Sequence, residues 1–567
     1  MRPYHRFASA LVVAGSCSGG ALSAQAASTA AANAYKGLTP GQSTRQDAHK
    51  ALGAPAEGMH RGECDWYPVP GAAAVTDRLF FAGSGKLRGV SAGSTDPRYA
   101  TRQQILAKLG PPEARVRFLT QEFLDYSEKG LRFICDASGK TTGAIYFSAG
   151  QRRMPAGYPN VFDLRRQPPR PGPARAPAGF RVGTAEISIA PQRLDDIAAD
   201  AKKHRYTVHE DLLARVAIFQ QGDDKIVLIG LDVFGMAPWD LRALRKSLAR
   251  HGFDKVILAM SHTHANVDTI GFYGYYPKAY AQHIVRQTER VVLAAAKDMK
   301  PVKVLKTGMV EMPLAGGRVV DLVWNGRDPG LVDPAVSLIQ AIGEDDRPIV
   351  NVIHLACHPE VIRLRDTYGL SPDYVGTLCK EVRRQLGGQP VFLNGALGGM
   401  LTPDARERGY ASAVAMGKGF ARFVVQAAAA ATPVSSYDLW LHRRPVEYPV
   451  TAKAILKFLQ NAPGPVDLVK GRVRTEMNAV WIGDVQMITV PGELLPELGF
   501  QIMSKMTGKL RLIVGLANDE LGYLIPSYDF RAGQYEERTG PGAAGGAITR
   551  AVGLELAPLG PATPKQQ

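Results

Sequence analysis

The chain of 567 residues is too long for a single hydrophobic core, and its 45% hydrophobic and 21% charged residues are typical of a globular protein. These numbers exclude a one-core protein and predict two or three domains. The formal net charge of +16 and the pI of about 9.5 favour anionic partners such as lipid head groups, envelope polymers or nucleic acid, without choosing among them.

Residues 1–26 have the pattern of a signal peptide. A basic start, MRPYHR, precedes the apolar stretch FASALVVAG, which is too short to cross a bilayer. Ala24-Gln25-Ala26 is a small-x-small cleavage site, and Cys17 offers a lipoprotein-like alternative. We therefore expect an exported protein, periplasmic or secreted, with lipid anchoring through Cys17 as the alternative.

Two tandem repeats follow within residues 37–150. The segment from Thr44 to Pro55 recurs from Thr101 to Pro112, and each copy predicts a short helix that is stopped by Gly and Pro. A strand-like tail that turns at Ser-Gly-Lys follows both helices. The repeats resemble those of bacterial envelope lipoproteins of the outer-membrane assembly type, which implies a small α+β module with a structural or partner-binding role.

Cysteine spacing excludes a zinc ribbon, because the sequence has no CxxC pair. A disulfide between Cys64 and Cys135 is possible in an exported protein. The segment 151–179 holds seven prolines and one acidic residue, Asp163, a composition that favours an extended linker. Its six arginines are better explained by a solvated linker than by a nucleic-acid-binding arm. They are Arg152, Arg153, Arg165, Arg166, Arg170 and Arg175.

From Phe180 to about residue 550, apolar runs alternate with helical stretches. The runs cover residues 226–233, 255–260, 348–359, 390–396, 485–493 and 510–519, and a helix is expected over 239–252. Strands that are apolar on both faces and separated by helices predict an α/β domain, with a mixed, largely parallel sheet and helices on both faces. Residues 551–567 are expected to form a flexible tail.

Polar residues follow these apolar runs, where loops of an α/β sheet gather ligands. They are Asp232, His262 with His264, His358, Glu493, and Asn518 with Asp519. The two-residue period of an extended chain would point His262 and His264 to the same side. Neutral imidazole is a common zinc ligand, and Glu493 would complete a His/His/Glu set that leaves a position open for water.

A structural role is an alternative to metal binding for each of these polar residues. A single histidine at a strand end is more often a hydrogen-bonded structural residue, and His354, inside the same run as His358, is expected to lie in the core. The metal hypothesis rests on the coincidence of several such residues at one edge.

Six segments, in order, resemble the conserved blocks of the neutral/alkaline ceramidase family over residues 180 to about 540. They are FRVGTAEISIAP, SHTH, ACHP, LSPDYVG, VPGE and GLANDELGY. Members of that family are zinc amidohydrolases that cut the N-acyl bond of ceramide. The resemblance implies four zinc ligands, His262, His358, Glu493 and Tyr523.

The same resemblance implies three catalytic residues. His264 faces the reacting centre, and Tyr535, twelve residues after Tyr523 and followed by Glu536, stabilises the oxyanion. Arg327 of WNGRDP matches a family arginine. The mechanism would use metal-activated water, with hydrogen bonds from His264 and Tyr535 to the tetrahedral oxyanion.

The sequence also departs from the family. Residues 265–268 read ANVD instead of Ser-Gly-Pro, residues 394–399 read NGALGG where the family has a functional serine, and a Gly, Ala and Pro-rich tail takes the place of a C-terminal β-sandwich. These departures leave the metal site intact, but the acylated amine need not be ceramide.

The sequence therefore predicts an exported zinc-dependent amidohydrolase that acts on a ceramide-like or other acylated amine or lipid, with contact to an anionic membrane surface and no nucleic-acid partner. One alternative is an esterase or lactonase that uses the same metal site. Another is a non-catalytic envelope-binding protein on the same fold. A serine hydrolase built on Gly89-Val90-Ser91-Ala92-Gly93 is the weakest, because no strand, elbow and helix pattern surrounds Ser91.

Overall fold

The computed structural model describes residues 33–561, except 56–59, 62–63, 70–71, 94–95, 151–160, 165–174 and 329. The predicted signal peptide with Cys17, most of the predicted linker and the end of the predicted tail lie outside these residues. The chain forms two compact units. Unit 1 comprises Met1–Val161 with Leu314–Gly317, and unit 2 comprises Phe162–Pro313 with Arg318–Gln567.

Unit 1 is an antiparallel sheet with two short helices. Its elements are α2 (Arg45–Leu52), β1 (His60–Arg61), β2 (Cys64–Val69), β3 (Ala72–Phe81), β4 (Leu87–Ala92), η1 (Pro97–Tyr99), α3 (Arg102–Leu109), β5 (Ala114–Arg117), β6 (Gln121–Tyr126), η2 (Ser127–Lys129), β7 (Leu131–Asp136) and β8 (Thr141–Phe147). The strand order is β1-β2-β3-β4-β8-β7-β6-β5. β9 (Val161–Asp163) follows at the border of the two units.

The two repeats of unit 1 use the same local chemistry. Thr44 and Thr101 cap α2 and α3 through capping boxes, and both helices end at a glycine, as the sequence predicts. Each capping threonine also bridges the lysine of the following Ser-Gly-Lys turn. Neither Cys64 nor Cys135 is in a disulfide. Their strands, β2 and β7, are not neighbours in the sheet.

Unit 2 begins with the larger of its sheets. Its elements up to α8 are β10 (Arg181–Ser188), β11 (Thr207–Val208), β12 (Leu213–Gln221), β13 (Asp224–Leu231), α4 (Pro238–Arg250), β14 (Val256–Met260), α5 (Lys278–Lys297), β15 (Met299–Glu311), β16 (Val323–Asn325), β17 (Ala335–Gly343), β18 (Pro348–Leu355), α6 (Leu364–Thr367), β19 (Gly369–Leu370), α7 (Tyr374–Leu386), β20 (Gln389–Asn394), β21 (Leu401–Pro403) and α8 (Tyr410–Ala429). The sheet order is β14-β13-β12-β10-β15-β17-β18-β20, with β22 (Thr432–Pro433) paired to β15.

A second sheet follows in the C-terminal part, with order β23-β25-β26-β28 and β24 paired to β25. The elements are β23 (Leu439–Pro449), α9 (Lys453–Gln460), β24 (Leu468–Val469), β25 (Arg472–Ile482), β26 (Val485–Thr489), β27 (Glu493–Leu494), α10 (Pro496–Met503), β28 (Leu510–Val514), β29 (Tyr523–Leu524), η3 (Ser527–Asp529), α11 (Tyr535–Arg538) and α12 (Gly545–Leu556). Residues 551–556, predicted to belong to a flexible tail, are helical because α12 buries Val552 and Leu556.

The α/β class is confirmed, but the prediction of a largely parallel sheet is wrong. Only the edge pairs β13–β14 and β18–β20 are parallel in the larger sheet, and the other pairings along its path are antiparallel. In the second sheet only β26 and β28 run parallel. The apolar runs are buried on both faces because helices cover one face and other strands cover the other.

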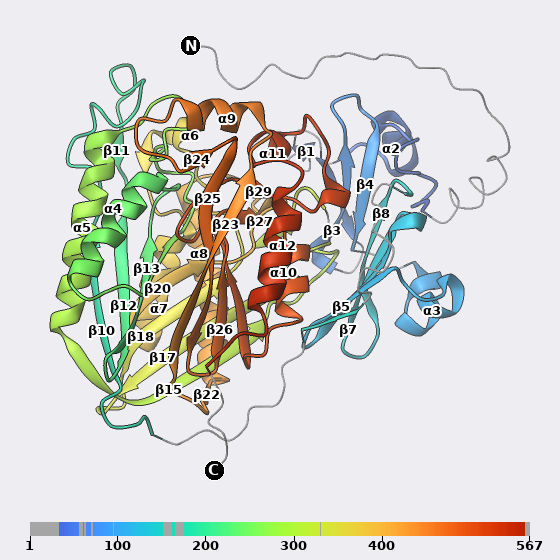
Figure 1. Cartoon of the computed structure of the whole chain (residues 1–567). Helices are drawn as coiled ribbons and strands as arrows, with labels where there is room; N and C mark the ends of the chain where they lie inside the picture. The colour runs from blue at the N-terminus through green and yellow to red at the C-terminus, as the bar shows by residue number, and fades with distance from the viewer. Residues whose placement is uncertain are drawn as a thin grey trace. The chain divides into compact units, whose positions relative to one another are not determined.

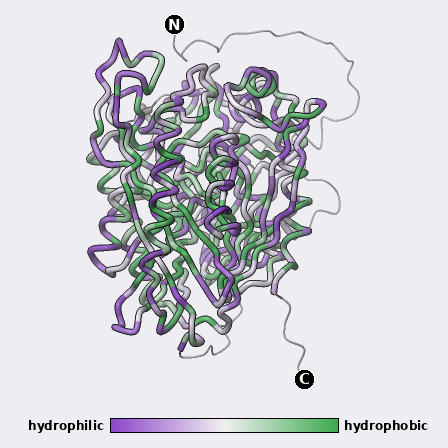
Figure 2. Tube along the Cα trace, turned by 60° about the vertical axis from the view of Figure 1, so that its left-hand side comes forward, coloured by the Kyte–Doolittle hydropathy of each residue, from purple (hydrophilic) through white to green (hydrophobic). Residues whose placement is uncertain are grey.

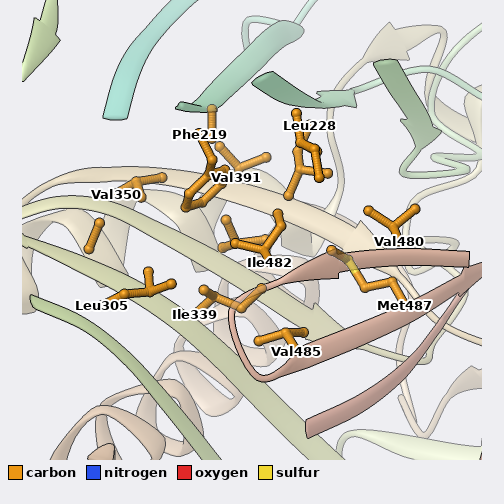
Figure 3. Packing of buried hydrophobic residues seen from close by; sticks show 14 of the residues in the cluster. Phe219, Leu228, Leu305, Ile339, Val350, Val391, Val480, Ile482, Val485 and Met487 are labelled. Atoms are coloured by element: carbon orange, nitrogen blue, oxygen red, sulfur yellow. The ribbon is translucent and has the colours of Figure 1, made fainter. Parts of the chain in front are cut away.

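One face of β10, β12, β13 and β14 packs against helices, and the other packs against strands. α4 and α5 bury Leu244 and Ile284 on the first face (Figure 1). On the second face, Leu228 belongs to the same core as Val391 of β20 and Ile482 of β25 (Figure 3). The prediction that helices cover both faces of this sheet is therefore wrong for these strands, because helices cover one face and strands cover the other. Each fully buried side chain of this size stabilises the fold by roughly 1.5–3 kcal/mol.

The hydropathy along the chain follows this packing. Apolar colour runs along the interior strands, whereas loops at the periphery are hydrophilic (Figure 2). Within the part of the chain that the structure describes, no helix combines the length and the apolar character needed to cross a membrane.

Candidate functional site

Four loops of unit 2 carry the predicted metal ligands. His262 follows β14, His358 follows β18, Glu493 follows β26 and opens β27, and Tyr523 follows β28 and opens β29. β27 and β29 pair in parallel with Glu493 opposite Tyr523, which fixes these two side chains next to each other. The larger sheet, the second sheet and the β27–β29 pair of unit 2 thus all contribute to the site.

The backbone at His262 differs from the extended geometry that the sequence predicts. β14 ends at Met260, and His262 has a φ of 70°, in the left-handed region that non-glycine residues rarely adopt. Its N–H donates to the carbonyl of Val233 at 3.0 Å, which helps to hold this conformation. Such strain amounts to about 1–3 kcal/mol and is commonly found at functional sites. The turn still brings the rings of His262 and His264 to a centroid distance of 5.0 Å.

His262, His264 and His358 form a compact group, called here the histidine cluster. One ring nitrogen from each lies within 4.8 Å of those of the other two. The ring of His358 lies 5.2 Å from that of His262 and 5.8 Å from that of His264, between centroids. The spacing allows one metal ion to be shared by side chains of the cluster.

Hydrogen bonds determine which nitrogen of two cluster residues faces the centre. Nδ1–H of His262 donates to the carbonyl of Phe234 at 2.7 Å, and Nδ1–H of His358 donates to the carbonyl of Leu401 at 3.0 Å. Backbone acceptors of this kind fix the tautomer of a metal-binding histidine and leave Nε2 for the metal.

Glu493 lies where these two Nε2 atoms converge. Its Oε2 is 2.8 Å from Nε2 of His358, and its Oε1 is 3.7 Å from Nε2 of His262. The hydroxyl of Tyr523 donates to the same carboxylate and lies 3.5 Å from the sulfur of Met400. The structure therefore brings together all four predicted ligands.

His264 approaches the same centre from another side. Its Nε2 is buried and has no hydrogen-bond partner among the described residues. The nearby Glu360 is held by the hydroxyl of Thr402, which donates to its carboxylate, and by Arg408, which donates to its carbonyl. Burial raises the pKa of Glu360, but His264 and His358 outweigh this effect and hold it at about 2.

Burial keeps two imidazoles of the cluster neutral. It lowers the pKa of His262 to about 3 and that of His264 to about 4. Burial acts most strongly on His358 and lowers its pKa, but the hydrogen bond with Glu493, the charges of Glu493 and Glu360 and the bond to the carbonyl of Leu401 together outweigh it and raise the pKa of His358. The pKa of Glu493 is lowered, because the neighbouring histidines outweigh the effect of burial. A carboxylate with neutral imidazoles is a donor set that zinc prefers.

A pocket opens onto the cluster, and the empty space in and around it, open solvent included, is about 630 Å³. Its polar lining comes from His262, His264, Glu493, Glu520, Tyr523, Tyr535 and Thr539. Its other lining residues are mainly aliphatic and aromatic: Phe234, Ile270, Phe272, Tyr273, Ile455, Phe458, Leu459, Leu521 and Gly522. A few polar groups at one end of an apolar cavity are typical of a site for a ligand with a hydrocarbon part.

Tyr535 and Arg327 occupy different positions relative to this pocket. Tyr535 lines it, 43% exposed, with its ring centroid 6.1 Å from that of Tyr523. Arg327 is not among the lining residues. Its guanidinium donates to Asp529 at 2.8 Å, Glu536 at 2.5 Å and Glu537 at 2.7 Å. It therefore fixes the segment that carries Tyr535, and a direct catalytic role for Arg327 stays a prediction.

Other polar residues at the predicted edge have structural partners. Asp232 accepts two hydrogen bonds from Arg215 at 2.8 and 2.9 Å, and Asn518 accepts one from the backbone of Leu258 at 2.9 Å. His354 is buried in the core, as expected, with Nε2–H donating to the carbonyl of Ile513 at 2.7 Å.

Ser91 lies inside β4, and its hydroxyl donates to the carbonyl of Gly316. The strand continues through this residue, so the nucleophile elbow of a serine hydrolase is not formed here.

Sequence reasoning missed several residues of the pocket. Phe234 supplies the carbonyl that orients His262 and stacks on its ring at 4.7 Å, and Glu520 presents a carboxyl group to the pocket. Glu520 lies in the same GLANDELGY block as Tyr523, which was a usable signal. No motif marked α9, whose Ile455, Phe458 and Leu459 close the apolar side.

Comparison with known proteins shows the fold. No protein-family model matches the chain, and no curated protein does. The neutral ceramidase of Pseudomonas aeruginosa is similar in structure, with a TM-score of 0.56 and 15% identity over 67% of this chain and 74% of that one. A ceramidase described as complexed with C2 has the same TM-score, with 14% identity over 67% and 75% of the two chains.

The chain has a ceramidase-like fold. The resemblance to neutral ceramidases that the sequence blocks indicate is thereby confirmed at the level of the fold. Among the residues that the structure describes, the histidine cluster of this site is a group that could bind a metal ion.

Proposed function

We propose that this protein is a zinc-dependent hydrolase that cleaves the N-acyl bond of a ceramide-like or other acylated amine. One observation carries the proposal: Nε2 of His262 and Nε2 of His358 converge on the two oxygens of Glu493, while both Nδ1 atoms are held by backbone carbonyls. The ceramidase-like fold and the resemblance of the sequence blocks support it.

His262, His358, Glu493 and Tyr523 would hold the ion. Their chemistry fits zinc, because the set offers nitrogen and oxygen donors only, and the two imidazoles have second partners that fix their orientation. When bound, the zinc would supply Lewis acidity toward the amide carbonyl and toward a water molecule.

The remaining polar groups would act on the substrate itself. Nε2 of His264 is buried without a partner and belongs to the group whose nitrogens lie within 4.8 Å of one another, so it can donate to an oxygen that becomes negative during the reaction. Tyr535, which also lines the pocket, can provide a second donor. Arg327 would position Tyr535 through Glu536.

The apolar side of the pocket supports a lipid-like substrate. Phe272, Phe458 and Leu459 could pack on an acyl chain, and a chain so placed would leave its carbonyl toward the cluster. An esterase or lactonase would use the same groups, since the carbonyl chemistry is shared.

Export and surface contact complete the proposal. The signal-like residues 1–26 would direct the protein out of the cytoplasm, with Cys17 as the site of a lipid anchor in the alternative. The net charge of +16 would favour an anionic membrane surface, where an acylated amine would be found.

The test is hydrolysis by the purified, zinc-loaded full chain. A set of N-acyl amines that includes N-dodecanoyl-sphingosine, with the corresponding O-acyl esters, should give release of fatty acid from the amides. Glu493→Ala and His358→Ala should abolish it, whereas Glu555→Gln, an exposed substitution on α12, should not. Cleavage of esters alone would favour the esterase, and stoichiometric zinc without any hydrolysis would contradict the enzyme proposal.

A further inference from the structure

Asp268 binds the backbone of the loop that follows β14. Its Oδ1 accepts hydrogen bonds from the N–H groups of Ile270 and Gly271, both at 2.9 Å, and its Oδ2 accepts one from the N–H of Tyr273 at 2.7 Å. Burial raises the pKa of this carboxyl group, and the N–H groups oppose that effect because they favour the ionised form. Hydrogen bonds to a charged acceptor are about twice as strong as neutral ones, so one side chain holds residues 270–273 in place.

The two ends of this loop are anchored elsewhere, but its middle is not. At the start, the hydroxyl of Thr269 donates to the carbonyl of Gly235, and at the end the hydroxyl of Tyr276 donates to a carboxylate of α4 at 2.6 Å. Between these anchors Tyr273 is 46% exposed, so packing alone does not fix the backbone there. The conformation of the middle of the loop therefore depends on Asp268.

Phe272 is the side chain that this arrangement places. The N–H groups on either side of it, those of Gly271 and Tyr273, are both bound by Asp268. The ring of Phe272 packs edge to face on that of Phe458 of α9, with 5.7 Å between the centroids. Both rings line the pocket. The pair therefore joins the loop to α9 along the apolar side of the pocket.

The loop begins in a part of the sequence that departs from the ceramidase family, since residues 265–268 read ANVD instead of Ser-Gly-Pro. Asp268 does not line the pocket, and it is not part of the histidine cluster. It can therefore affect the pocket only through the loop that it binds.

We propose that Asp268 is a positioning residue for substrate binding, because it holds Phe272 against Phe458 and this pair closes the apolar side of the pocket. The inference rests on the proposed function, in which an acylated amine enters this pocket. Without the carboxylate, the N–H groups of the loop would turn to water and Phe272 would leave Phe458. Substrate would then bind more weakly, while the histidine cluster would keep its geometry.

Asp268→Asn tests this role with almost no change of shape. One carboxylate oxygen becomes an NH₂ group, which cannot accept an N–H of the loop. With the zinc-loaded full chain and N-dodecanoyl-sphingosine, we expect KM to rise by about 10-fold or more, the range of one hydrogen bond to a charged group, while kcat stays within about twofold. Zinc content should stay at the wild-type level. An unchanged KM, a lower kcat or a loss of zinc would each overturn the inference.

Two further variants separate positioning from a general effect on the fold. Asp345→Asn is the matched control, because Asp345 accepts the N–H of Arg347 at 3.1 Å in the exposed turn between β17 and β18. It should leave KM and kcat unchanged. Phe272→Ala should raise KM by itself, and adding Asp268→Asn should raise it by no more than about twofold further, since the side chain that Asp268 positions is gone. Effects on KM that multiply in the double variant would overturn the inference.

Binding and proteolysis distinguish this inference from the proposed function. If the wild type does not hydrolyse the amide, the proposed function fails, and calorimetry with the same amide decides. A Kd about 10-fold weaker in Asp268→Asn supports the inference, whereas equal Kd values, or no binding by the wild type, overturn it. Chymotrypsin reports on the loop itself. It should cut Asp268→Asn after Phe272 roughly 10-fold faster than wild type, because cleavage follows the population of the open loop, and equal rates would overturn the inference.

Discussion

Arg327→Met tests whether the buried arginine supports the segment that carries Tyr535. The side chain of Arg327 is 6% exposed, and its three carboxylate partners are each exposed by 5% or less. Removing the cation leaves buried carboxylates without their main counter-charge, although Asp529 keeps a second partner in Arg531 at 2.8 Å. Breaking a buried ion pair from one side typically lowers the free energy of unfolding by about 3–5 kcal/mol, and we expect a loss in this range at pH 7.

The loss should depend on pH in a defined direction. Burial already raises the pKa of Glu536 to about 7 despite Arg327, and the variant would raise it further. A carboxyl group whose folded-state pKa lies above its unfolded value is least unfavourable at low pH and becomes more unfavourable as pH rises through the folded pKa. The destabilisation should therefore be larger at pH 8 than at pH 5.

Urea unfolding of the full chain at pH 5, 7 and 8, followed by circular dichroism and tryptophan fluorescence, measures this effect. The matched control is Arg444→Met, because Arg444 and its partner Glu555 are 46% and 57% exposed and such pairs contribute about 1 kcal/mol or less. Zinc content should be retained while kcat falls, since Tyr535 loses its support. A loss of stability below about 1 kcal/mol at pH 7, or one that grows at pH 5, would refute the reasoning.

Three further predictions concern single side chains. Tyr535→Phe should keep zinc and reduce kcat by about 100-fold or more if its hydroxyl stabilises the oxyanion, which steady-state kinetics with metal analysis would detect; an unchanged kcat would remove Tyr535 from the mechanism. Ser91→Ala should leave hydrolysis within about twofold of wild type and reduce stability by roughly 1 kcal/mol, because its hydroxyl donates a hydrogen bond to the carbonyl of Gly316; abolished hydrolysis with an intact fold would revive the serine hydrolase. Burial lowers the pKa of His354 to about 4, so this residue makes the fold lose about 3 kcal/mol as pH falls from 6.5 to 4, and His354→Gln should flatten that part of the stability profile in urea titrations; an unchanged slope would contradict the shift.

The sequence predicts much of the candidate site because the predicted ligands lie in short, ordered motifs. His262, His358, Glu493 and Tyr523 each lie next to an apolar run, and the structure brings the four together. The motif spacing does not reveal which backbone conformation brings the side chain of His262 to the other three. The left-handed backbone at His262 is held by a tertiary hydrogen bond to the carbonyl of Val233, and no local sequence pattern predicts this bond.

The sheet arrangement was less predictable for a physical reason. A strand such as β13 reads as apolar on both faces whether it is covered by two layers of helices or by helices on one side and strands on the other. Leu228 and Ile229 are both fully buried, but the first packs in the core between sheets and the second against helices. The alternation of strands and helices therefore fixed the α/β class and not the direction of the strands.

Burial also explains why some polar residues near the predicted edge are not part of the site. Asp232 is 1% exposed and is satisfied by Arg215, and no periodicity in the sequence connects these two residues. Glu520 is the opposite case, since only the three-dimensional arrangement reveals that its Oε2 has no hydrogen-bond partner among the residues that the structure describes. Whether a polar residue is structural or functional is decided by its partners, which the sequence does not display.

The central claim is that one zinc ion is bound by His262, His358 and Glu493. Elemental analysis of the purified full chain after zinc loading and extensive dialysis tests it most directly, with Glu493→Ala and His358→Ala prepared in parallel. The account predicts one zinc per wild-type chain and a loss of stoichiometric zinc in both variants, with secondary structure retained by circular dichroism. A wild-type chain that retains no zinc, or a Glu493→Ala chain that retains it fully, would contradict the account.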